Sequence, residues 1–352
     1  MSNHQQALDA WTTLCRALES AGRNVLASAP DSLDAGEGLR FLTRALRFAL
    51  ERQMEGADAD FPLLTRSSHE TLKLMSDSPD YYYEIATISG AHDYRIRTTR
   101  GSGEVLAFST YGRGPAGVMC TGEFRPTLEQ FDANGICEFV ASTRSRGSGW
   151  LPMDGSTFFM QVRNMCRDPA RRDPAWVRIE RIGAPIVPTP FTIERATPLL
   201  QAAAGQLNAI VGSINAFRDG IRARVGVNAF DHDQGPWIAG GSLPSTYYIQ
   251  AVYELEEDEA LEIETDVPEN SYFSVQLNNH WVESLDYLRH RIHLSKYSAE
   301  RERDGRLRIV VAHRSPGTAN WLDTAGHRTG VIAWKWNDAE YRPQPSIRRV
   351  QP

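Results

Sequence analysis

Two residues four positions apart, an aspartate and a histidine, could carry acid–base chemistry in this sequence. Asp323 and His327 lie in the segment SPGTANWLDTAGH, residues 315–327. A carboxylate that accepts a hydrogen bond from an imidazole fixes its tautomer, and an imidazole titrates near neutral pH, so the pair could act as a general base. Alternatively, Asp323 accepts backbone N–H groups in its own turn and His327 packs at the start of the next strand. The sequence supports both interpretations.

A strand-like segment, SYFSVQLNNHW at residues 271–281, carries a second set of polar side chains. Alternation with a period of two predicts that Gln276, Asn278 and His280 share one face. They would supply the convergent polar groups of a ligand pocket if that face lines a cavity, and they would be ordinary solvated residues if it faces water. We predict that His280 is a third catalytic residue, which stabilises negative charge on a substrate oxygen.

Amides and aromatic rings in strand-like segments and loops are candidates for substrate binding. An amide can hold an oxyanion or a turn, an indole can stack on a ligand or fill the core, and a tyrosine hydroxyl can recognise an alcohol or a phenol. Most of the tyrosines must pack in the core. The predicted substrate-binding residues are Asn278, Asn279, Trp281, Tyr247, Tyr248, Tyr272, Asn320 and Trp321.

The sequence predicts neither a metal centre nor a bound cofactor. Asp231-His232-Asp233 precedes Gln-Gly-Pro as a polar turn would, and His290 and His293 lack the glutamate of an HExxH helix. No GxGxxG motif lies between a strand and a helix, and neither GxxxxGK[ST] nor GxSxG occurs. The cysteines are spread singly along the chain with no CxxC pair, which favours free thiols over a zinc ribbon or a disulfide framework. These cysteines are Cys15, Cys120, Cys137 and Cys166.

Composition limits the classes of partner. The chain has 352 residues and a formal net charge of −6, which disfavours general binding to nucleic acid. Acidic residues interleave with an arginine-rich stretch from Arg163 to Arg181, so we expect a salt-bridged surface there. The sequence shows no cleavable leader and no apolar run as long as a bilayer demands. We expect a cytoplasmic protein that binds a hydrophobic or aromatic small molecule, no nucleic acid and no membrane, and that could form a homo-oligomer.

Helical and strand-like patterns divide the chain. Apolar residues recur at helical spacing from Gln5 to about Ala27, from Leu39 to Leu50 and from Thr192 to Arg224, and a further short helix is expected at Ser67–Met75. Short runs of β-branched and aromatic residues, bounded by Gly, Pro, Asn or Asp, fill the chain on both sides of the long helix. Asn134-Gly135 is the best single hairpin turn.

These patterns predict an α+β fold. It has a helical N-terminal region, antiparallel β-sandwich or jelly-roll-like sheets, and a long helix between the two strand-rich halves. The predicted regions are 1–77 (helical), 78–190 (first β-rich region) and 191–352 (helix plus second β-rich region), and the alternative is that the last two form one continuous sandwich. The segment 315–327 is then a loop between two strands, held by a rigid sheet.

Several ordered motifs resemble a bacterial family called domain of unknown function twelve-fourteen. The motifs are SYFSVQLNNHW (271–281), the strand at 308–313, the SPGTANWLDTAGH loop and VIAWKW (331–336), while WLPMDGSTFFMQVRNM and WVRIERI resemble the longer members. The resemblance is clearest in the C-terminal third. It implies a cytosolic β-sandwich-type fold and an association with the breakdown of hydrophobic or aromatic compounds, and it supplies no catalytic residues.

We therefore hypothesise a cofactor-independent lyase or hydrolase that acts on a hydrophobic hydroxylated small molecule, such as a lignin-derived aromatic or a steroid-like compound. His327, oriented by Asp323, would remove a proton while His280, Asn279 or a tyrosine stabilises the developing charge. The alternatives are a non-catalytic small-molecule-binding or scaffolding protein and a metal-dependent enzyme. Catalysis would change the mass of the ligand, binding would not, and a metal enzyme would contain stoichiometric metal.

Overall fold

A computed structural model gives the fold of the chain. It describes residues 1–115, 117–166, 173–183, 187–239, 242–243, 245–269 and 271–351. Part of the arginine-rich stretch named above, Arg167, Asp168, Arg171 and Arg172, lies outside the described residues.

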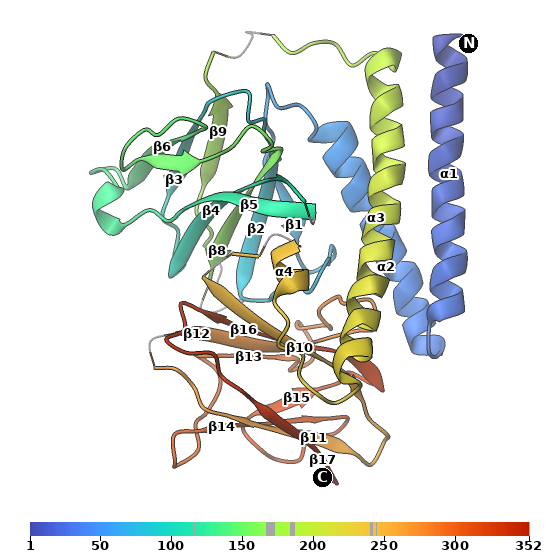
Figure 1. Cartoon of the computed structure of the whole chain (residues 1–352), viewed down its shortest axis with the longest axis vertical. Coiled ribbons are helices and arrows are strands. Elements are labelled where there is room, and N and C mark those ends of the chain that lie inside the picture. The colour runs from blue at the N-terminus through green and yellow to red at the C-terminus, as the bar shows by residue number, and fades with distance from the viewer. Residues whose placement is uncertain are drawn as a thin grey trace.

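Three long helices form one side of the molecule. α1 spans Asn3–Ser28, α2 spans Ser32–Leu50 and α3 spans Ile193–Val225. The side chains of Ser2 and Asp31 accept hydrogen bonds from backbone N–H groups in the first turns of α1 and α2, as N-caps do. Figure 1 shows α1 and α3 side by side. The shorter helical elements are η1 (Glu51–Glu55), η2 (Leu128–Gln130) and α4 (Gly235–Ala239).

None of the helices in the described ranges combines the length and the apolar character that a membrane span requires.

The strands before α3 form a first sandwich of two sheets. One sheet has the order β1-β2-β8-β4-β5 and the other the order β7-β6-β3-β9. Neighbouring strands are antiparallel, except that β6 and β7 are parallel. The strands are β1 (Thr65–Ser68), β2 (Tyr81–Thr87), β3 (Tyr94–Thr99), β4 (Val105–Gly114), β5 (Gly117–Phe124), β6 (Ile136–Ser142), β7 (Trp150–Pro152), β8 (Phe159–Met165) and β9 (Val177–Arg181).

The strands after α3 form a second sandwich. Its sheets have the orders β10-β16-β12-β13 and β15-β14-β11-β17, and here only β14 and β15 are parallel. The strands are β10 (Thr246–Glu254), β11 (Ala260–Thr265), β12 (Tyr272–Asn278), β13 (His293–Ser295), β14 (Leu307–Ala312), β15 (Trp321–Asp323), β16 (Thr329–Asn337) and β17 (Ser346–Val350).

Each sandwich has its own hydrophobic core because its strands send alternate residues between its two sheets. Phe108 and Phe139 belong to the first core, and Leu277, Trp334 and Trp336 belong to the second. The expected α+β fold, with a long helix between two strand-rich halves, is confirmed.

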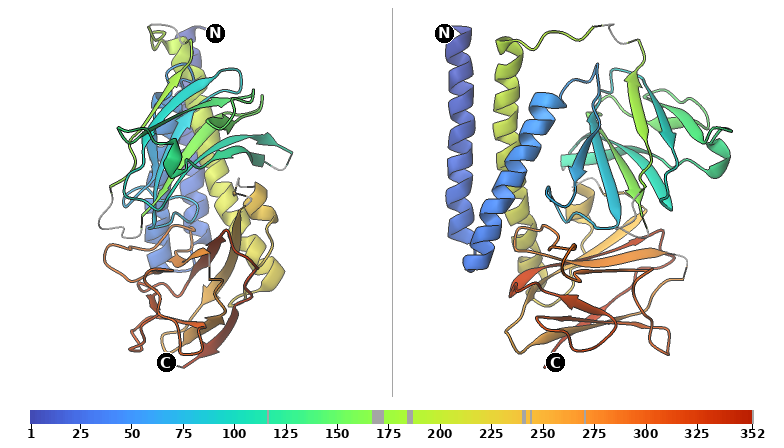
Figure 2. Two further views of the ribbon diagram at one scale, coloured as in Figure 1. Left: turned by 90° about the vertical axis from the view of Figure 1, so that its left-hand side faces the viewer. Right: turned by 180° about the vertical axis from the view of Figure 1, so that it is seen from behind.

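The two sandwiches are stacked, so that the sheet β1-β2-β8-β4-β5 of the first faces the sheet β10-β16-β12-β13 of the second (Figures 1 and 2). Leu207, Ile214 and Ile221 of α3 belong to one buried cluster with Val252 and Val331 of the second sandwich. α3 therefore packs on the second sandwich through an apolar contact.

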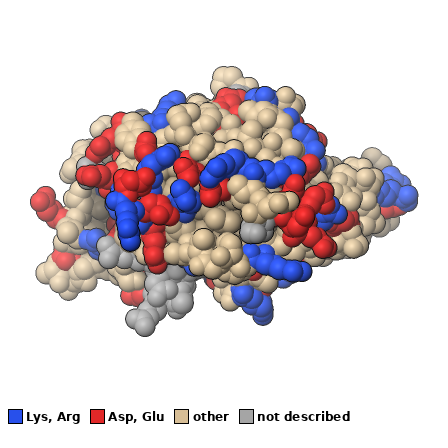
Figure 3. All heavy atoms as spheres, turned by 90° about the horizontal axis from the view of Figure 1, so that it is seen from below, with Lys and Arg blue, Asp and Glu red and all other residues tan. Residues whose placement is uncertain are grey.

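The outward sheet of the second sandwich carries charges of both signs. Glu262 pairs with Arg348, and Glu264 pairs with Arg306 and Arg308. Figure 3, which views this end of the molecule, shows blue and red side chains intermixed over the surface. Exposed pairs of this kind contribute little to stability and are typical of a solvated face.

The short helix expected at Ser67–Met75 is wrong. Thr65–Ser68 forms strand β1 and pairs with β2, and His69 and Leu72 exchange backbone hydrogen bonds in a tight turn. Pairing with β2 satisfies the backbone of this segment better than an isolated turn or two of helix could, so the tertiary contact overrides the local pattern.

The hairpin expected at Asn134-Gly135 is also wrong, although a turn is present. Gly135 has φ +72°, and its N–H donates to the carbonyl of Asp132. The turn leads from η2 into β6, and β5 and β6 belong to different sheets, so it does not join paired strands. A turn sequence predicts the local backbone conformation, and it does not predict whether the strands before and after the turn pair with each other.

The segment 315–327 runs between β14 and β16 as expected, but it is not loop throughout. Trp321–Asp323 forms the short strand β15, which extends the sheet beside Val310–Ala312. Asp323 is therefore fixed by a sheet, and only the residues on either side of β15 have the freedom of a loop.

Candidate functional site

A cavity of about 340 Å³ lies between the facing sheets of the two sandwiches, and residues of α3 and α4 close one side of it. Its size falls at the lower end of the range of small-molecule sites. Most of the wall is apolar and comes from both sandwiches and the helices. The apolar residues include Phe48, Leu74, Ile85, Phe159, Ile210, Phe217, Trp237 and Val282.

Strand alternation explains why polar side chains face this cavity. Met160 and Val162 of β8 point into the first core, so Gln161 and Arg163 between and after them point out of it toward the second sandwich. In β16, the two tryptophans that flank Lys335 fill the second core, and the lysine faces the cavity. Each sandwich thus presents one polar strip to the space between them.

Backbone strain is concentrated at the cavity wall. Met75, Ser76 and Val282 line the cavity with φ values of +51°, +58° and +55°, in the left-handed region that favours glycine. The N–H of Ser76 donates to the carbonyl of Val282 at 2.7 Å, so the two strained segments are joined. Such conformations persist where the surrounding structure enforces them, and they are enriched at ligand sites.

Arg163 presents a half-buried guanidinium to the cavity. Its Nη1 donates to the hydroxyl of Ser109 at 3.2 Å, and its Cζ lies 5.7 Å from the ring centroid of Tyr111. Within the described ranges no carboxylate forms an ion pair with it. The expectation of a salt-bridged surface is therefore wrong for Arg163, whereas the exposed Arg178 does pair with Glu180.

Lys335 presents an amine from the opposite side. Its Nζ lies 4.0 Å from the ring centroid of Tyr81, and it has no ion pair with any carboxylate of the described chain. Burial lowers the pKa of this amine to about 7, the charge of Asp80 acts in the opposite direction, and the charge of Arg163 lowers the pKa further. At neutral pH a large fraction of Lys335 is therefore a neutral amine, which is both a base and a nucleophile.

A buried carboxylate acts electrostatically on this amine. Asp80 is 2% exposed, and its Oδ2 accepts hydrogen bonds from Nε2 of His293, at 2.8 Å, and from the hydroxyl of Tyr272. Burial opposes ionisation of Asp80, but His293, Lys335 and the Tyr272 hydroxyl together lower its pKa below the usual value. Asp80 is therefore an anion that can hold or accept protons behind Lys335.

The remaining polar wall is internally satisfied. Gln276 lines the cavity, and its Nε2 donates to the carbonyl of Asp77 at 2.7 Å and to Oδ1 of Asn278 at 2.8 Å. The carboxylate of Asp77 accepts from the backbone N–H and the hydroxyl of Ser284 at 3.1 Å and 2.9 Å, and burial raises its pKa. Gln276 and Asp77 are thus bound by their neighbours, and Arg163 and Lys335 are the basic side chains that the cavity lining offers to a ligand.

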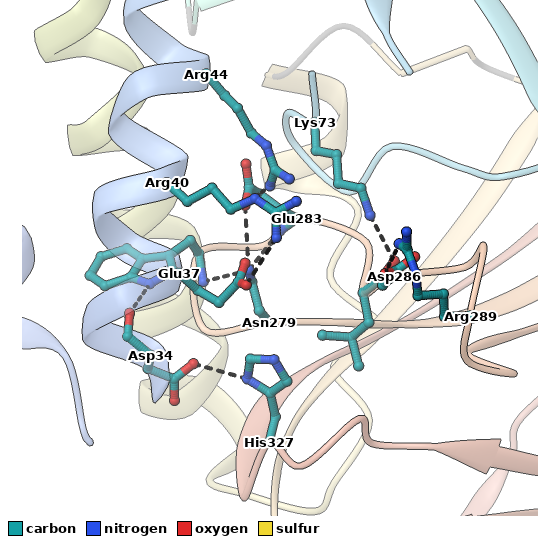
Figure 4. Close-up of polar contacts among 12 residues, drawn as sticks. Asp34, Glu37, Arg40, Arg44, Lys73, Asn279, Glu283, Asp286, Arg289 and His327 are labelled. Atoms are coloured by element: carbon teal, nitrogen blue, oxygen red, sulfur yellow. Dashed lines mark hydrogen bonds and ion pairs between the residues drawn. The ribbon is translucent and has the colours of Figure 1, made fainter. Parts of the chain in front are cut away.

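The predicted hydrogen bond between Asp323 and His327 is wrong. Nδ1 of His327 lies 3.1 Å from Oδ1 of Asp34 in α2 (Figure 4). Oδ2 of Asp323 bonds instead to Nδ1 of His290. Oδ1 of Asp323 accepts the N–H of Ala325 in its own turn, as the structural alternative proposed. β15 holds Asp323 in the sheet, and the turn that follows carries His327 toward the helix.

His327 and its neighbours form a buried polar cluster that joins α2 to the second sandwich (Figure 4). Arg44 of α2 pairs with Glu283 at 2.7 Å, and the side-chain N–H of Asn279 donates to the same carboxylate. Burial raises the pKa of Glu283 to about 8, and the charge of Arg44 opposes that rise. These residues do not line the cavity, and their bonds hold elements together.

His280 and Trp281 also lie outside the cavity lining. His280 bonds to Arg218 of α3, and burial together with the Arg218 charge lowers its pKa to about 4, which keeps the ring neutral. Trp281 is fully buried, stacks on Phe41 and donates from its indole to the carbonyl of Asp34. The chain leaves β12 after Asn278, so the expected alternation does not continue to His280.

The structure places only some of the predicted substrate-binding residues at or next to the cavity. Tyr248 lines the cavity beside Lys335, its cross-strand neighbour. Tyr247 points to the opposite face and bonds to His232, and Tyr272 bonds to Asp80 next to the cavity. Three others have local structural bonds: Asn279 caps its own turn, Asn320 bonds to the backbone of Glu300 and Arg308, and Trp321 donates to the carbonyl of Ala312.

The residues weighed as metal ligands have protein partners. Asp231 pairs with Arg224, His232 bonds to Tyr247, and His290 and His293 bond to the two different aspartates named above. In the portion of the chain that the structure describes, no group of three or more potential ligands converges.

Sequence reasoning did not identify Arg163 and Lys335. A signal for Lys335 is present, because a charged residue between two tryptophans in WKW must share a strand with core residues and point to the opposite face. Alternation in FMQVRNM similarly places Gln161 and Arg163 together. What the sequence does not show is that these two faces meet, since their strands are far apart in the chain.

Comparison with solved structures finds similarity over the whole chain. An uncharacterized protein from Burkholderia cenocepacia is 35% identical, with 99% of this chain and 98% of that chain covered and a TM-score of 0.92. The VPA0106 protein from Vibrio parahaemolyticus is 11% identical, with 89% of this chain and 98% of that chain covered and a TM-score of 0.50, which shows a likeness of fold alone. No family model and no curated protein matches the chain, so the resemblance to domain of unknown function twelve-fourteen stays a prediction.

Proposed function

We propose a function for this chain, which belongs to the same family as the uncharacterized protein from Burkholderia cenocepacia, from the chemistry of its cavity. In this proposal the cavity binds a mainly apolar small molecule that carries a carboxylate or a similar oxyanion. The apolar wall takes the body of the molecule, and Arg163 and Lys335 take its charged end.

The observation that carries the proposal is the pair of basic side chains, Arg163 and Lys335, in an apolar cavity without a carboxylate partner in the described chain. A cation removed from water is costly unless an anion compensates it. A ligand carboxylate would supply that anion, and the planar guanidinium of Arg163 could bind it through two hydrogen bonds. Gln161 would hydrogen-bond a further oxygen atom of the ligand.

Matched ligands and matched variants test this proposal. 3-Phenylpropionate should raise the melting temperature in a saturable way, and 3-phenylpropionamide, which has the same shape without the charge, should bind at least about tenfold more weakly. Arg163→Gln should lose the preference for the acid. Arg178→Gln, a change of an exposed arginine on β9, should keep it. Equal binding of the acid and the amide by the unaltered protein would reject the anionic end of the ligand.

A second candidate function is a lyase or hydrolase that works by general acid–base catalysis on a hydrophobic hydroxylated molecule. The observation that favours it is the amine of Lys335, whose pKa of about 7 suits a base near neutral pH. Lys335 would replace His327 in the hypothesised role because His327 is outside the cavity lining. Incubation of hydroxylated aromatics with substoichiometric protein, followed by mass spectrometry, should give a new product mass that is absent with Lys335→Met.

A further inference from the structure

We propose that Lys335 forms an imine with the carbonyl carbon of a 2-oxo acid that has an apolar or aromatic side chain. This inference rests on the proposed binding of an apolar anion in the same cavity, and it names the ligand class and the reaction. It follows from three features: the free amine, the guanidinium beside it, and the composition of the wall.

Lysine is rare in this chain, and one of its few lysines faces the cavity. Among 38 basic residues there are three lysines, Lys73, Lys296 and Lys335. Lys73 donates to the carbonyls of Ser284 and Leu285 at 2.6 Å and 2.7 Å, and Lys296 is exposed. Lys335 is the only one of the three that lines the cavity. Its neighbour on one side is an aromatic ring and not a carboxylate, so its amine is available to a ligand.

The guanidinium lies close enough to the amine for one small molecule to reach both. Arg163 and Lys335 both line the main cavity and also a small adjoining space of about 30 Å³, and Tyr83 and Tyr248 line both spaces as well. These four side chains therefore lie between the two spaces. In a 2-oxo acid the carboxylate carbon is bonded directly to the carbonyl carbon, so the groups that bind the two must be neighbours.

Imine formation balances with the groups present. The nitrogen lone pair of neutral Lys335 attacks the carbonyl carbon, a C–N bond forms, and the carbonyl oxygen takes a proton to become a hydroxyl. The C–O bond then breaks as the hydroxyl takes a second proton and leaves as water, and the nitrogen loses both of its protons to give the neutral C=N bond. The hydroxyls of Tyr83 and Tyr248, which burial keeps protonated by raising their pKa, can supply protons to oxygen. No oxidant or reductant is consumed.

The wall determines which side chain the 2-oxo acid can carry. Phe159, Ile210, Phe217 and Trp237 line the part of the cavity contributed by β8, α3 and α4. An aromatic ring or a branched alkyl chain matches this surface, and a charged side chain would lose its hydration there. Phenylpyruvate has the required carboxylate, the adjacent ketone and an aromatic group, and it is the probe of choice.

Reductive trapping tests the inference directly. The full-length protein is incubated with phenylpyruvate and sodium cyanoborohydride, which reduces an imine to a stable secondary amine. We expect one adduct per chain, heavier by phenylpyruvate less one oxygen atom, on the peptide that contains Lys335. It should form at least roughly tenfold faster than any adduct on Lys296, because more of the Lys335 amine is neutral at pH 7.

Matched controls separate this inference from the binding proposal. Lys335→Arg should abolish the adduct, Lys296→Arg should keep it, and excess 3-phenylpropionate should suppress it in the unaltered protein. This competition keeps the test valid if Lys335→Arg does not fold. Thermal stabilisation by 3-phenylpropionate without any Lys335 adduct would overturn the imine and leave the binding proposal standing. If 3-phenylpropionate does not stabilise the protein and no adduct forms, both proposals are overturned. Equal labelling of Lys296 and Lys335 would show only surface reactivity and would also overturn the imine.

Discussion

His293 Nε2 lies 2.8 Å from the Oδ2 atom of Asp80, and this bond connects β13 to the segment that enters β2. The same carboxylate accepts the hydroxyl of Tyr272 and lies within electrostatic reach of Lys335. One buried anion therefore joins the two sandwiches at the edge of the cavity and also raises the pKa of the amine inside it.

The first prediction concerns this anion. Asp80 raises the pKa of Lys335 against the stronger effect of burial, so Asp80→Asn should lower that pKa below about 7. Less of the amine is then charged at neutral pH, and a carboxylate ligand should bind more weakly. Both proteins should lose affinity for 3-phenylpropionate as the pH rises. The pH midpoint of this loss should be lower in Asp80→Asn than in the unaltered protein by roughly one unit.

Calorimetric titrations at a series of pH values measure this midpoint. Arg163 and the rings of Tyr81 and Tyr248 also face Lys335, and none of them changes in this variant. Asp266→Asn removes an exposed acid of the second sandwich and should leave the midpoint in place. A midpoint that does not move in Asp80→Asn would show that Asp80 does not act on the amine.

The second prediction is that Lys335 reduces the stability of the fold. Its pKa is about 7 in the folded protein and 10.5 ordinarily, so between about pH 7 and 10.5 the unfolded chain binds a proton that the folded chain releases. The resulting loss of stability is largest below about pH 7 and disappears as the pH rises toward 10.5. Lys335→Met should therefore melt at a higher temperature than the unaltered protein at pH 7. The gain in the free energy of unfolding should be at most about 1.4 kcal/mol for each unit by which folding lowers the pKa of Lys335.

The difference between the two proteins should shrink as the pH is raised from 7 to 10. Lys296→Met changes an exposed lysine and should show no such pH-dependent gain. Thermal unfolding monitored by circular dichroism across this range is the measurement. Lower stability of Lys335→Met at pH 7 would mean that the amine makes a net favourable contact in the cavity.

The sequence predicts the elements of this fold much better than it predicts the site. The long helix at Ile193–Val225 and the strand around Lys335 follow from periodicity, which is a local property. The cavity depends on contact between β8 and β16, whose residues Arg163 and Lys335 are separated by most of the second half of the chain. Alternation indicates that each faces away from its own core, but no local signal tells which surface it meets.

The pairing of His327 illustrates the same limit in the other direction. Asp323 was expected as its partner because it is four residues away, yet Asp34, from the opposite end of the chain, makes the bond. A short spacing makes a contact possible, and the tertiary structure decides whether another acceptor is better placed. Glu283 and Arg44, which pair in the same buried cluster, were likewise joined only by folding.

The third prediction is that His327 contributes to stability and not to ligand binding. It is 4% exposed, bonds to Asp34 and does not line the cavity. His327→Ala leaves the buried carboxylate of Asp34 without this donor, which should reduce the free energy of unfolding by about 1–3 kcal/mol. Urea unfolding measures the loss, and titration with 3-phenylpropionate below the transition should give an unchanged affinity.

Asp323→Asn is the matched control. Its partner His290 is 39% exposed, so the change should reduce the stability by less than about 1 kcal/mol. If His327→Ala retained full stability but lost ligand binding or turnover, the catalytic role hypothesised from the sequence would be restored.

The fourth prediction concerns the protonation of Glu283. Its contact with Arg44 at 2.7 Å has the geometry of an ion pair, yet complete burial of the carboxyl raises its pKa to about 8. We expect the effect of burial to prevail and the carboxyl to be protonated, because desolvation of both groups can exceed their mutual attraction. Between pH 4.5 and about 8 the folded chain then holds a proton that the unfolded chain has lost, so the stability contributed by this group falls as the pH rises through that interval.

Glu283→Gln keeps the shape and the neutral state of the protonated acid. Its stability should be close to that of the unaltered protein near pH 5, and it should become the more stable of the two as the pH approaches 8. Urea unfolding at several pH values measures the difference, with Glu256→Gln, a change of an exposed glutamate, as a control that should give no trend. A constant loss of several kcal/mol in Glu283→Gln across this range would instead establish a charged pair with Arg44, since removal of one partner leaves the other charge buried and alone.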